Sequence, residues 1–419
     1  MANKEGLMQQ LPWVISVDDH VVEPPTVWSD RLPSAMRERG PRVVQDRCET
    51  IIEPSSKVAR YVKGGDGPIV DWWMYEDVLR PIPQVMACAG FPPESLTLQP
   101  LPFAEMRRGC FDRDARLADM DVNRTERSLC FPTFPRFAGQ LFLEASDKTV
   151  ALESVRAYND WMIDEWCGPS HGRLIPLCLV PLWDPELAAA EVRRNAARGC
   201  HAVAFTELPA NLGLPSLHDA DRHWDPFLAA CDETRTTINM HIGSGSRMPT
   251  TSADAPSGVG IALTSLNAYM AMADWLLSGV MERFANLKIA FSESQVGWMP
   301  FLLERLDHLY TKSKAWADLD PSLTDLPSSY VPGRVYGCFF DDMVGVDARH
   351  QIGIGQLVFE TDYPHQDSTW PHTVDLVAKI AERVTPSELE MLVRTNAIDM
   401  LHLDPADLRP MTLHGSVTR

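Results

Sequence analysis

The sequence has few cysteines, and none of them is spaced as a metal or redox motif. Its nine cysteines are scattered over 419 residues without a CxxC pair. This odd, dispersed set argues against a disulfide scaffold and against a structural zinc site made of thiolates. We expect most of the cysteines to be small buried hydrophobic residues in a reducing compartment.

Positive charge and long apolar runs are also scarce. Lysine and arginine number 38 against 57 acidic residues, which gives a net charge of −19. Without a basic stripe to neutralise phosphates, nucleic acid and anionic membranes are excluded as partners. No run is long enough to span a bilayer, and the N-terminal stretch contains no cleavable apolar segment. We therefore expect a soluble, cytoplasmic protein that acts on a small molecule.

Alternation of strands and helices is the dominant pattern. Apolar strand-like segments are predicted over residues 14–17, 128–134, 174–182, 201–205, 237–241, 287–292, 334–340 and 357–361. Helical patterns separate most of them, as in buried parallel sheets. This favours an α/β fold, a (β/α)₈ barrel that forms a single unit over residues 1–419. A doubly wound open sheet is the alternative, but no glycine-rich phosphate fingerprint follows the first strand.

Residues 26–111 interrupt this pattern after the first strand. They contain many prolines and glycines, for example in KGGDG and GFPP. We predict an insertion with little regular structure that forms a lid over part of the site. Trp72 and Trp73 lie in this segment, and Trp370 lies in a later loop. Loop tryptophans near a barrel mouth are candidates to line an aromatic substrate pocket.

The first strand ends in Asp18, Asp19 and His20. Alternate residues of a strand share a face, so Asp18 and His20 should point the same way while Asp19 points away. A carboxylate and an imidazole fixed on one face could form half of a metal site. A hydrogen-bonded surface turn is the alternative for this pair considered by itself.

Polar groups follow three further strands at the same end of the predicted barrel. These residues are His241 after the fifth strand, Glu293 after the sixth, and Asp362 and His365 after the eighth. Carboxylate and imidazole donors suit zinc, iron or manganese. Arg247 could clamp a substrate carboxylate or pair with a surface acid. Glu207 stands at the fourth strand end, and its role is left open.

Five stretches carry a resemblance to a known family. They are SVDDHVVEPP, GCHAVAFTELP, HIGSG, FSESQVGWMPFLLERLD and ETDYPHQDSTWP. The chain resembles the amidohydrolase superfamily, in the branch of aminocarboxymuconate-semialdehyde decarboxylase and the hydroxybenzoate decarboxylases. The resemblance implies one divalent metal, usually zinc, with iron or manganese as alternatives. Its implied ligands are Asp18, His20, His241 and Asp362, and a homodimer is also implied.

One departure from this branch decides the expected reaction. Glu293 stands where the decarboxylases have a catalytic histidine, and a glutamate needs a raised pKa to shuttle protons in the same way. We therefore expect a metal-dependent hydrolase in which Asp362 or Glu293 is the general base and His365 or Arg247 holds substrate oxygens. Decarboxylation of an aromatic acid and metal-dependent ring closure with loss of water are the alternatives. A non-catalytic barrel that binds a small acid is the alternative of another class.

Overall fold

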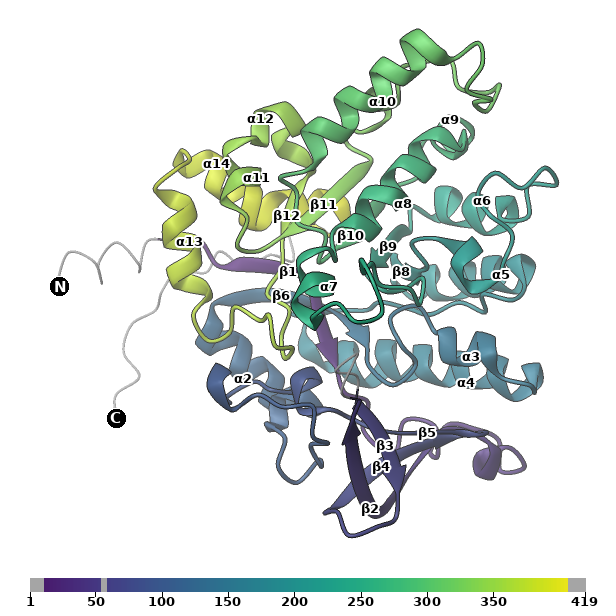
Figure 1. The fold of residues 1–419 in the computed structure, drawn as a ribbon, viewed down its shortest axis with the longest axis vertical. Helices are drawn as coiled ribbons and strands as arrows, with labels where there is room; N and C mark the ends of the chain where they lie inside the picture. The colour runs from purple at the N-terminus through teal and green to yellow at the C-terminus, as the bar shows by residue number, and fades with distance from the viewer. Residues whose placement is uncertain (1–10, 54–58, 406–419) are drawn as a thin grey trace, which may run out of the picture.

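Parallel strands form the centre of the molecule, and helices lie outside them (Figure 1). The computed structural model describes residues 11–53 and 59–405. Within these residues eight strands run parallel: β1 (Val14–Val21), β6 (Thr125–Pro132), β7 (Leu174–Ile175), β8 (Ala202–Phe205), β9 (Thr237–His241), β10 (Ile289–Ser292), β11 (Val335–Phe339) and β12 (Leu357–Phe359). A parallel bridge between Cys178 and Val203 joins the chain just after β7 to β8. The Asp362 N–H donates to the Asp18 carbonyl at 2.9 Å and joins β12 to β1. The predicted α/β barrel is confirmed.

The helices between the strands begin at residues that suit helix starts. Asp112 accepts a hydrogen bond from the Ala115 N–H at 2.9 Å, and Asp184 accepts from Leu187 at 3.0 Å. Each cap stabilises its helix by about 1 kcal/mol. The helices are α2 (Arg113–Asn123), α3 (Gln140–Glu144), α4 (Lys148–Trp161), α5 (Pro185–Ala196), α6 (Asp225–Thr234), α7 (Ser257–Ala262), α8 (Leu266–Leu277), α9 (Val280–Arg283), α10 (Met299–Ser313), α11 (Met343–Asp347), α12 (Arg349–Ile352), α13 (Thr373–Ala381), α14 (Pro386–Glu390) and α15 (Asn396–Met400).

The third barrel strand is much shorter than the sequence pattern predicts. The apolar run over residues 174–182 predicts one continuous strand, but β7 contains only its first two residues. Pro176 and Pro181 interrupt the run. Because proline has no N–H to donate, it cannot continue the ladder of a central strand. Only the bridge at Cys178 extends the pairing toward β8.

The segment between β1 and α2 contains a regular antiparallel sheet that projects from one side of the barrel (Figure 1). Its strands are β2 (Arg42–Ile52), β3 (Ala59–Lys63), β4 (Ile69–Tyr75) and β5 (Val78–Pro81). The prediction of little regular structure here is wrong. The KGGDG stretch is the turn between β3 and β4, where Gly64 and Gly65 have φ angles of +91° and +75°. Glycine adopts these left-handed angles without strain.

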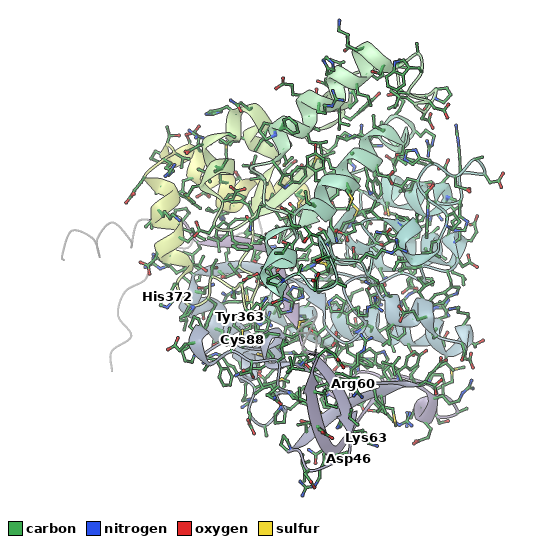
Figure 2. The ribbon with its side chains drawn as sticks, in the orientation of Figure 1. Asp46, Arg60, Lys63, Cys88, Tyr363 and His372 are labelled. Carbon is green, nitrogen blue, oxygen red and sulfur yellow. The ribbon has the colours of Figure 1, made fainter. Side chains whose placement is uncertain are left out.

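One end of this segment is exposed, and the other end contacts the barrel mouth. Figure 2 shows Asp46, Arg60 and Lys63 on the projecting sheet, where Lys63 Nζ lies 3.4 Å from Asp46 Oδ2. Cys88 lies beside Tyr363 in the same view, and its N–H donates to the Pro364 carbonyl at 2.9 Å. The segment therefore touches the loop that follows β12.

The cysteines are buried, and the helices of the described residues are short or polar. All nine cysteines are buried and free, so the prediction that they are small buried residues is confirmed. The Sγ atoms of Cys178 and Cys200 come within 3.3 Å of each other. Over residues 11–53 and 59–405, every helix is too short or too polar to cross a bilayer.

Glu23 is a buried carboxyl that connects the segment after β1 to the end of β6. Its two oxygens accept hydrogen bonds from the N–H groups of Thr133 and Phe134, both at 2.9 Å. The side chain is completely buried. Burial raises the pKa of Glu23 to about 7, although the two backbone donors act in the opposite direction.

This raised pKa predicts a pH-dependent stability. Between the ordinary value of 4.5 and about 7, the native state keeps a proton that the unfolded chain has lost. The contribution of Glu23 is therefore fully present below pH 4.5 and is lost as the pH rises through about 7. Between about pH 5 and about pH 8 the loss should approach 3 kcal/mol of unfolding free energy. Urea denaturation of the wild type and Glu23→Gln measures it, because the variant should lack this component.

The matched control is Glu186→Gln, which alters an exposed carboxyl at the start of α5. This control should follow the wild-type dependence on pH. Parallel stability profiles for the wild type and Glu23→Gln would show that Glu23 does not titrate in this range.

Candidate active site

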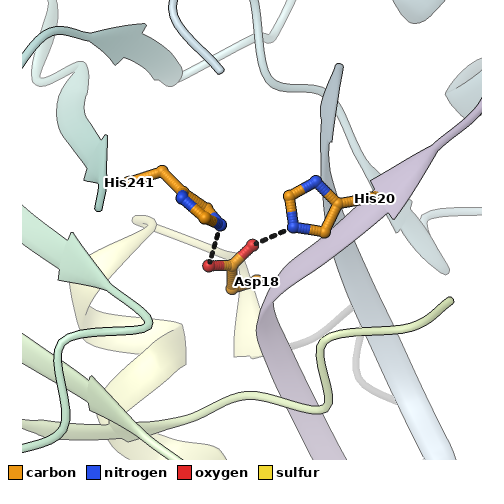
Figure 3. A group of neighbouring side chains, drawn as sticks. All are labelled: Asp18, His20 and His241. Carbon is orange, nitrogen blue, oxygen red and sulfur yellow. Dashed lines mark ion pairs between the residues drawn. The ribbon is translucent and has the colours of Figure 1, made fainter. Parts of the chain in front are cut away.

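Asp18 and His20 project from the same face of β1 into the barrel mouth, as the strand alternation predicts (Figure 3). His20 Nε2 lies 3.5 Å from Asp18 Oδ1, and both side chains are completely buried. Asp19 points elsewhere. Its carboxylate accepts from the Thr361 hydroxyl at 2.6 Å and from the Tyr363 N–H at 2.9 Å. Asp19 therefore links β1 to the chain after β12.

His241, the last residue of β9, faces the same carboxylate from across the barrel. Its Nε2 lies 3.4 Å from Asp18 Oδ2 (Figure 3). Its Nδ1 lies 2.7 Å from the Ile242 carbonyl, an acceptor, so this nitrogen carries the proton. Burial lowers the pKa of His241 to about 3, and the ring is neutral near pH 7. The Nε2 lone pair is therefore available as a ligand.

Asp362 completes the group from the loop after β12. One of its oxygens, Oδ1, lies 3.2 Å from both His20 Nε2 and His365 Nδ1. The backbone bends at this residue, where φ is +51°. Burial raises the pKa of Asp362 well above its ordinary value.

These four side chains contain buried polar atoms without a hydrogen-bond partner. The atoms are both carboxylate oxygens of Asp18 and of Asp362, Nδ1 and Nε2 of His20, and Nε2 of His241. Leaving such groups unpaired in the interior costs several kcal/mol, and a bound cation would offset that cost. Donor atoms of Asp18, His20 and His241 all lie within 4.8 Å of one another, and so do those of His20, Asp362 and His365. Two carboxylates and two imidazoles match the donors that zinc and manganese accept.

We call the four residues Asp18, His20, His241 and Asp362 the ligand cluster. Two further glutamates lie beside it. Glu293 Oε2 lies 3.5 Å from His241 Nε2. Burial, and next the negative charge of Asp362, raise the pKa of Glu293 well above its ordinary value. The Glu293 N–H donates to Glu360 Oε2 at 3.1 Å and so fixes a residue whose φ is +54°.

Glu360 is a residue that the sequence reasoning missed. It follows β12 directly and is completely buried. Burial raises its pKa well above the ordinary value. Its spacing could have identified it. Glu360 and Asp362 are two residues apart, as Asp18 and His20 are, and alternate residues of an extended chain share a face.

Glu207, whose role the sequence left open, positions the turn after His241. Its Oε1 accepts hydrogen bonds from the Gly243 N–H at 3.0 Å and from Asn267 Nδ2 at 2.9 Å. Burial raises the pKa of Glu207 to about 7. The carboxyl therefore acts on the backbone of the HIGSG turn and does not reach the ligand cluster.

Two ring stacks hold the histidines. His20 stacks on His365 with centroids 3.5 Å apart and planes at 17°. Phe137 stacks on His241 at 3.9 Å and 16°. Phe137 comes from the loop after β6, and no sequence motif distinguishes it from other buried aromatic residues.

The ligand cluster opens into a cavity of about 600 Å³. All three predicted catalytic residues, Glu293, Asp362 and His365, line this cavity. The rest of the lining is Val85, Met86, Phe137, His241, Ile242, Gly243, Ser246, Met248, Ile261, Ala262, Thr264, Ser265, Gln295, Phe340, Gln366 and Asp367. This volume lies within the usual range for small-molecule sites.

The residues proposed from the sequence to contact substrate lie outside this lining. Trp72 and Trp73 belong to β4 and are completely buried, so their prediction as loop residues is wrong. Trp73 stacks on Phe134 at 4.7 Å in the protein core. The indole N–H of Trp370 donates to the Asp119 carbonyl at 3.1 Å. Arg247 is exposed at the rim, between two residues that line the cavity.

Comparison with known proteins identifies the family. Residues 70–403 match the profile of the family described as amidohydrolase. A γ-resorcylate decarboxylase of Rhizobium sp. (strain MTP-10005) is 22% identical over 325 residues, which cover 70% of this chain and 88% of that protein.

Two solved structures share the fold. An amidohydrolase from Mycobacterium avium subsp. paratuberculosis K-10 has a TM-score of 0.67 and 22% identity, and the alignment covers 93% of this chain and 99% of that one. A dihydroxybenzoic acid decarboxylase from Polaromonas sp. JS666, solved with manganese and the inhibitor 2-nitroresorcinol, has a TM-score of 0.56 and 18% identity. That alignment covers 95% of this chain and 99% of the other.

The matched segment covers most of the chain and includes every barrel strand except β1. Two of the three similar proteins are decarboxylases of hydroxylated benzoic acids, the branch that the sequence motifs resemble. The alternative of a non-catalytic barrel is therefore set aside. The chain belongs to the amidohydrolase family and is an enzyme of the amidohydrolase superfamily.

Proposed function

We propose that this enzyme is a metal-dependent decarboxylase of a hydroxylated aromatic acid. The observation that carries the proposal is a buried ligand cluster with a glutamate of raised pKa beside it, on a cavity that several apolar side chains also line. The comparisons support this reaction, given above as an alternative, better than the hydrolysis that we expected.

The ligand cluster would hold the metal. A divalent cation bound there would act as a Lewis acid on the substrate's carboxylate and on a neighbouring hydroxyl. Zinc, expected from the resemblance, stays a prediction. Manganese is an equal candidate, because the donor set suits both and a neighbour of the same fold was solved with manganese.

Glu293 would supply the proton. The sequence argued against decarboxylation because a glutamate there needs a raised pKa, and its burial provides one. The proton on Glu293 moves to the ring carbon that bears the carboxylate. The bond from that carbon to the carboxylate then breaks, its electron pair returns to the ring, and carbon dioxide leaves. Glu293 ends as a carboxylate and regains its proton from water in the cavity.

Other residues have supporting roles in this proposal. Asp362 holds His365 through the 3.2 Å contact and so orients the ring that stacks on His20. Arg247 stays a proposed contact at the rim. We do not retain Trp72, Trp73 or Trp370 as substrate contacts, because other side chains line the cavity.

The segment 26–111 is proposed as an insertion that covers one side of the cavity. Val85 and Met86 support this role, since both line the cavity from that segment. We also propose a homodimer, which sedimentation of the purified protein tests directly.

Product analysis tests the reaction. We expect the manganese- or zinc-loaded enzyme to convert γ-resorcylate or salicylate to the corresponding phenol, with release of one carbon dioxide per turnover. Chelation of the metal should abolish the release. Incorporation of solvent oxygen without carbon dioxide would favour the hydrolase, and loss of water alone would favour the cyclase.

A further inference from the structure

The cavity has two chemically different parts. One part contains His241 and Asp362 of the ligand cluster together with Glu293, and the other contains six apolar side chains, namely Val85, Met86, Phe137, Met248, Ile261 and Phe340. Ile242 and a set of small and polar residues complete the lining. A cavity of about 150 Å³ is enough for a benzene ring. At about 600 Å³, this one has room for much more than a single ring.

Phe137 and Met248 place apolar surface between His241 and the rim. Phe137 stacks on His241 at 3.9 Å. Gly243, with a φ of +83°, leaves the next space open, because a Cβ there would lie 3.3 Å from Met248 Sδ and 3.4 Å from Phe137 Cε2. Beyond it, Met248 is 49% exposed and Ile261 is 56% exposed. Such exposed apolar side chains beside a cavity are typical of a surface that a ligand covers.

The same wall offers no positive charge. Within the part of the chain that the structure describes, no lysine or arginine lines the cavity, whereas Glu293, Asp362 and Asp367 all do. Arg136 reaches Ser246 at the rim, but it also pairs with Glu144 at 2.7 Å. Arg247, which stays a proposed substrate contact, is exposed at the rim between two lining residues and is not itself part of the lining. A second anionic group that lies along the lining would therefore have no cationic partner there beyond the metal.

We propose that the substrate is an aromatic acid with one anionic group and an apolar substituent, an alkyl chain or a fused ring, that lies along this wall. The inference rests on the proposed function only in taking an aromatic carboxylate as the group bound at the ligand cluster. The substituent gains affinity by leaving water, and a second carboxylate along the lining loses affinity because it gives up water without a counter-charge there.

A series of substituted acids tests the wall. The probes are salicylate, its methyl, propyl and pentyl derivatives substituted ortho to the carboxylate, and hydroxyisophthalate as the dianion. Binding is measured by calorimetry on metal-loaded Glu293→Gln, which should bind without turnover, and carbon dioxide release is measured on the wild type. Each added methylene should tighten binding by about fourfold. The dianion should bind at least about tenfold more weakly than salicylate.

Two matched variants locate the effect. Ile261→Gln makes the wall polar and should reduce the gain per methylene. Met270→Gln changes another exposed apolar residue, on α8 and outside the lining, and should leave the gain unchanged. Ile261→Lys adds a positive charge to the lining, so it should bring the affinity for the dianion closer to the affinity for the pentyl derivative.

The outcomes separate this inference from the proposed function. Equal affinity across the series, or preference for the dianion, would overturn the inference even if carbon dioxide is released. Graded affinity without carbon dioxide release from any acid would support the inference and overturn the decarboxylase.

Discussion

Replacing His241 with alanine should deprive the enzyme of its metal and abolish turnover. His241 offers a neutral Nε2 that faces Asp18 at 3.4 Å, with the other nitrogen fixed on the Ile242 carbonyl. Loss of an outer-shell partner alone typically costs about 10- to 100-fold in metal affinity or activity, so loss of a ligand should cost more than about a hundredfold. Metal content after dialysis and carbon dioxide release measure the two effects.

The metal should also stabilise the wild type, because its binding offsets the repulsion between buried carboxylates. A rise in melting temperature on addition of manganese or zinc is therefore expected for the wild type and not for His241→Ala. The matched control is His201→Ala, whose ring lies 3.0 Å from the Thr234 carbonyl, outside the site. Stoichiometric metal in folded His241→Ala would contradict the ligand assignment.

Much of the barrel could be predicted because each strand is specified by its own residues. The pattern over residues 237–241 predicts a buried strand, and β9 has those same bounds. In the third strand the apolar pattern was misleading, because the backbone of Pro176 and Pro181 overrides side-chain hydrophobicity. The antiparallel sheet was missed since its glycines, taken as irregular structure, are the tight turns of regular strands.

The candidate site was predictable to the extent that its residues end strands. Strand alternation correctly gave the common face of Asp18 and His20 and the separate direction of Asp19. Phe137 could not be found in this way, because it reaches His241 only through the folded loop after β6. The prediction for the tryptophans of β4 fails in the opposite way. Aromatic side chains suit a substrate pocket, but the strand places both of these in the core.

Replacing Glu293 with glutamine should lower kcat by about 100- to 10,000-fold, the usual contribution of a general acid or base. Glutamine keeps the shape of the protonated carboxyl but has no proton to give to the ring carbon. Glu293 belongs to the wall of the cavity and is not among the ligand cluster, so metal content should stay at the wild-type level. The expected result is therefore a metal-replete enzyme that binds aromatic acid and does not decarboxylate it.

The pH profile then distinguishes an acid from a base at this position. Burial and Asp362 raise the pKa of Glu293, so a proton donor there is active at lower pH and loses activity as the pH rises through that pKa. A general base for hydrolysis would show the opposite limb, with activity that increases as Glu293 ionises. Asp367→Asn is the matched control, since Asp367 lines the same cavity but is exposed, and it should cost less than about tenfold. A Glu293→Gln enzyme with wild-type kcat would exclude both roles, because neither chemistry can proceed through a side chain that cannot exchange a proton.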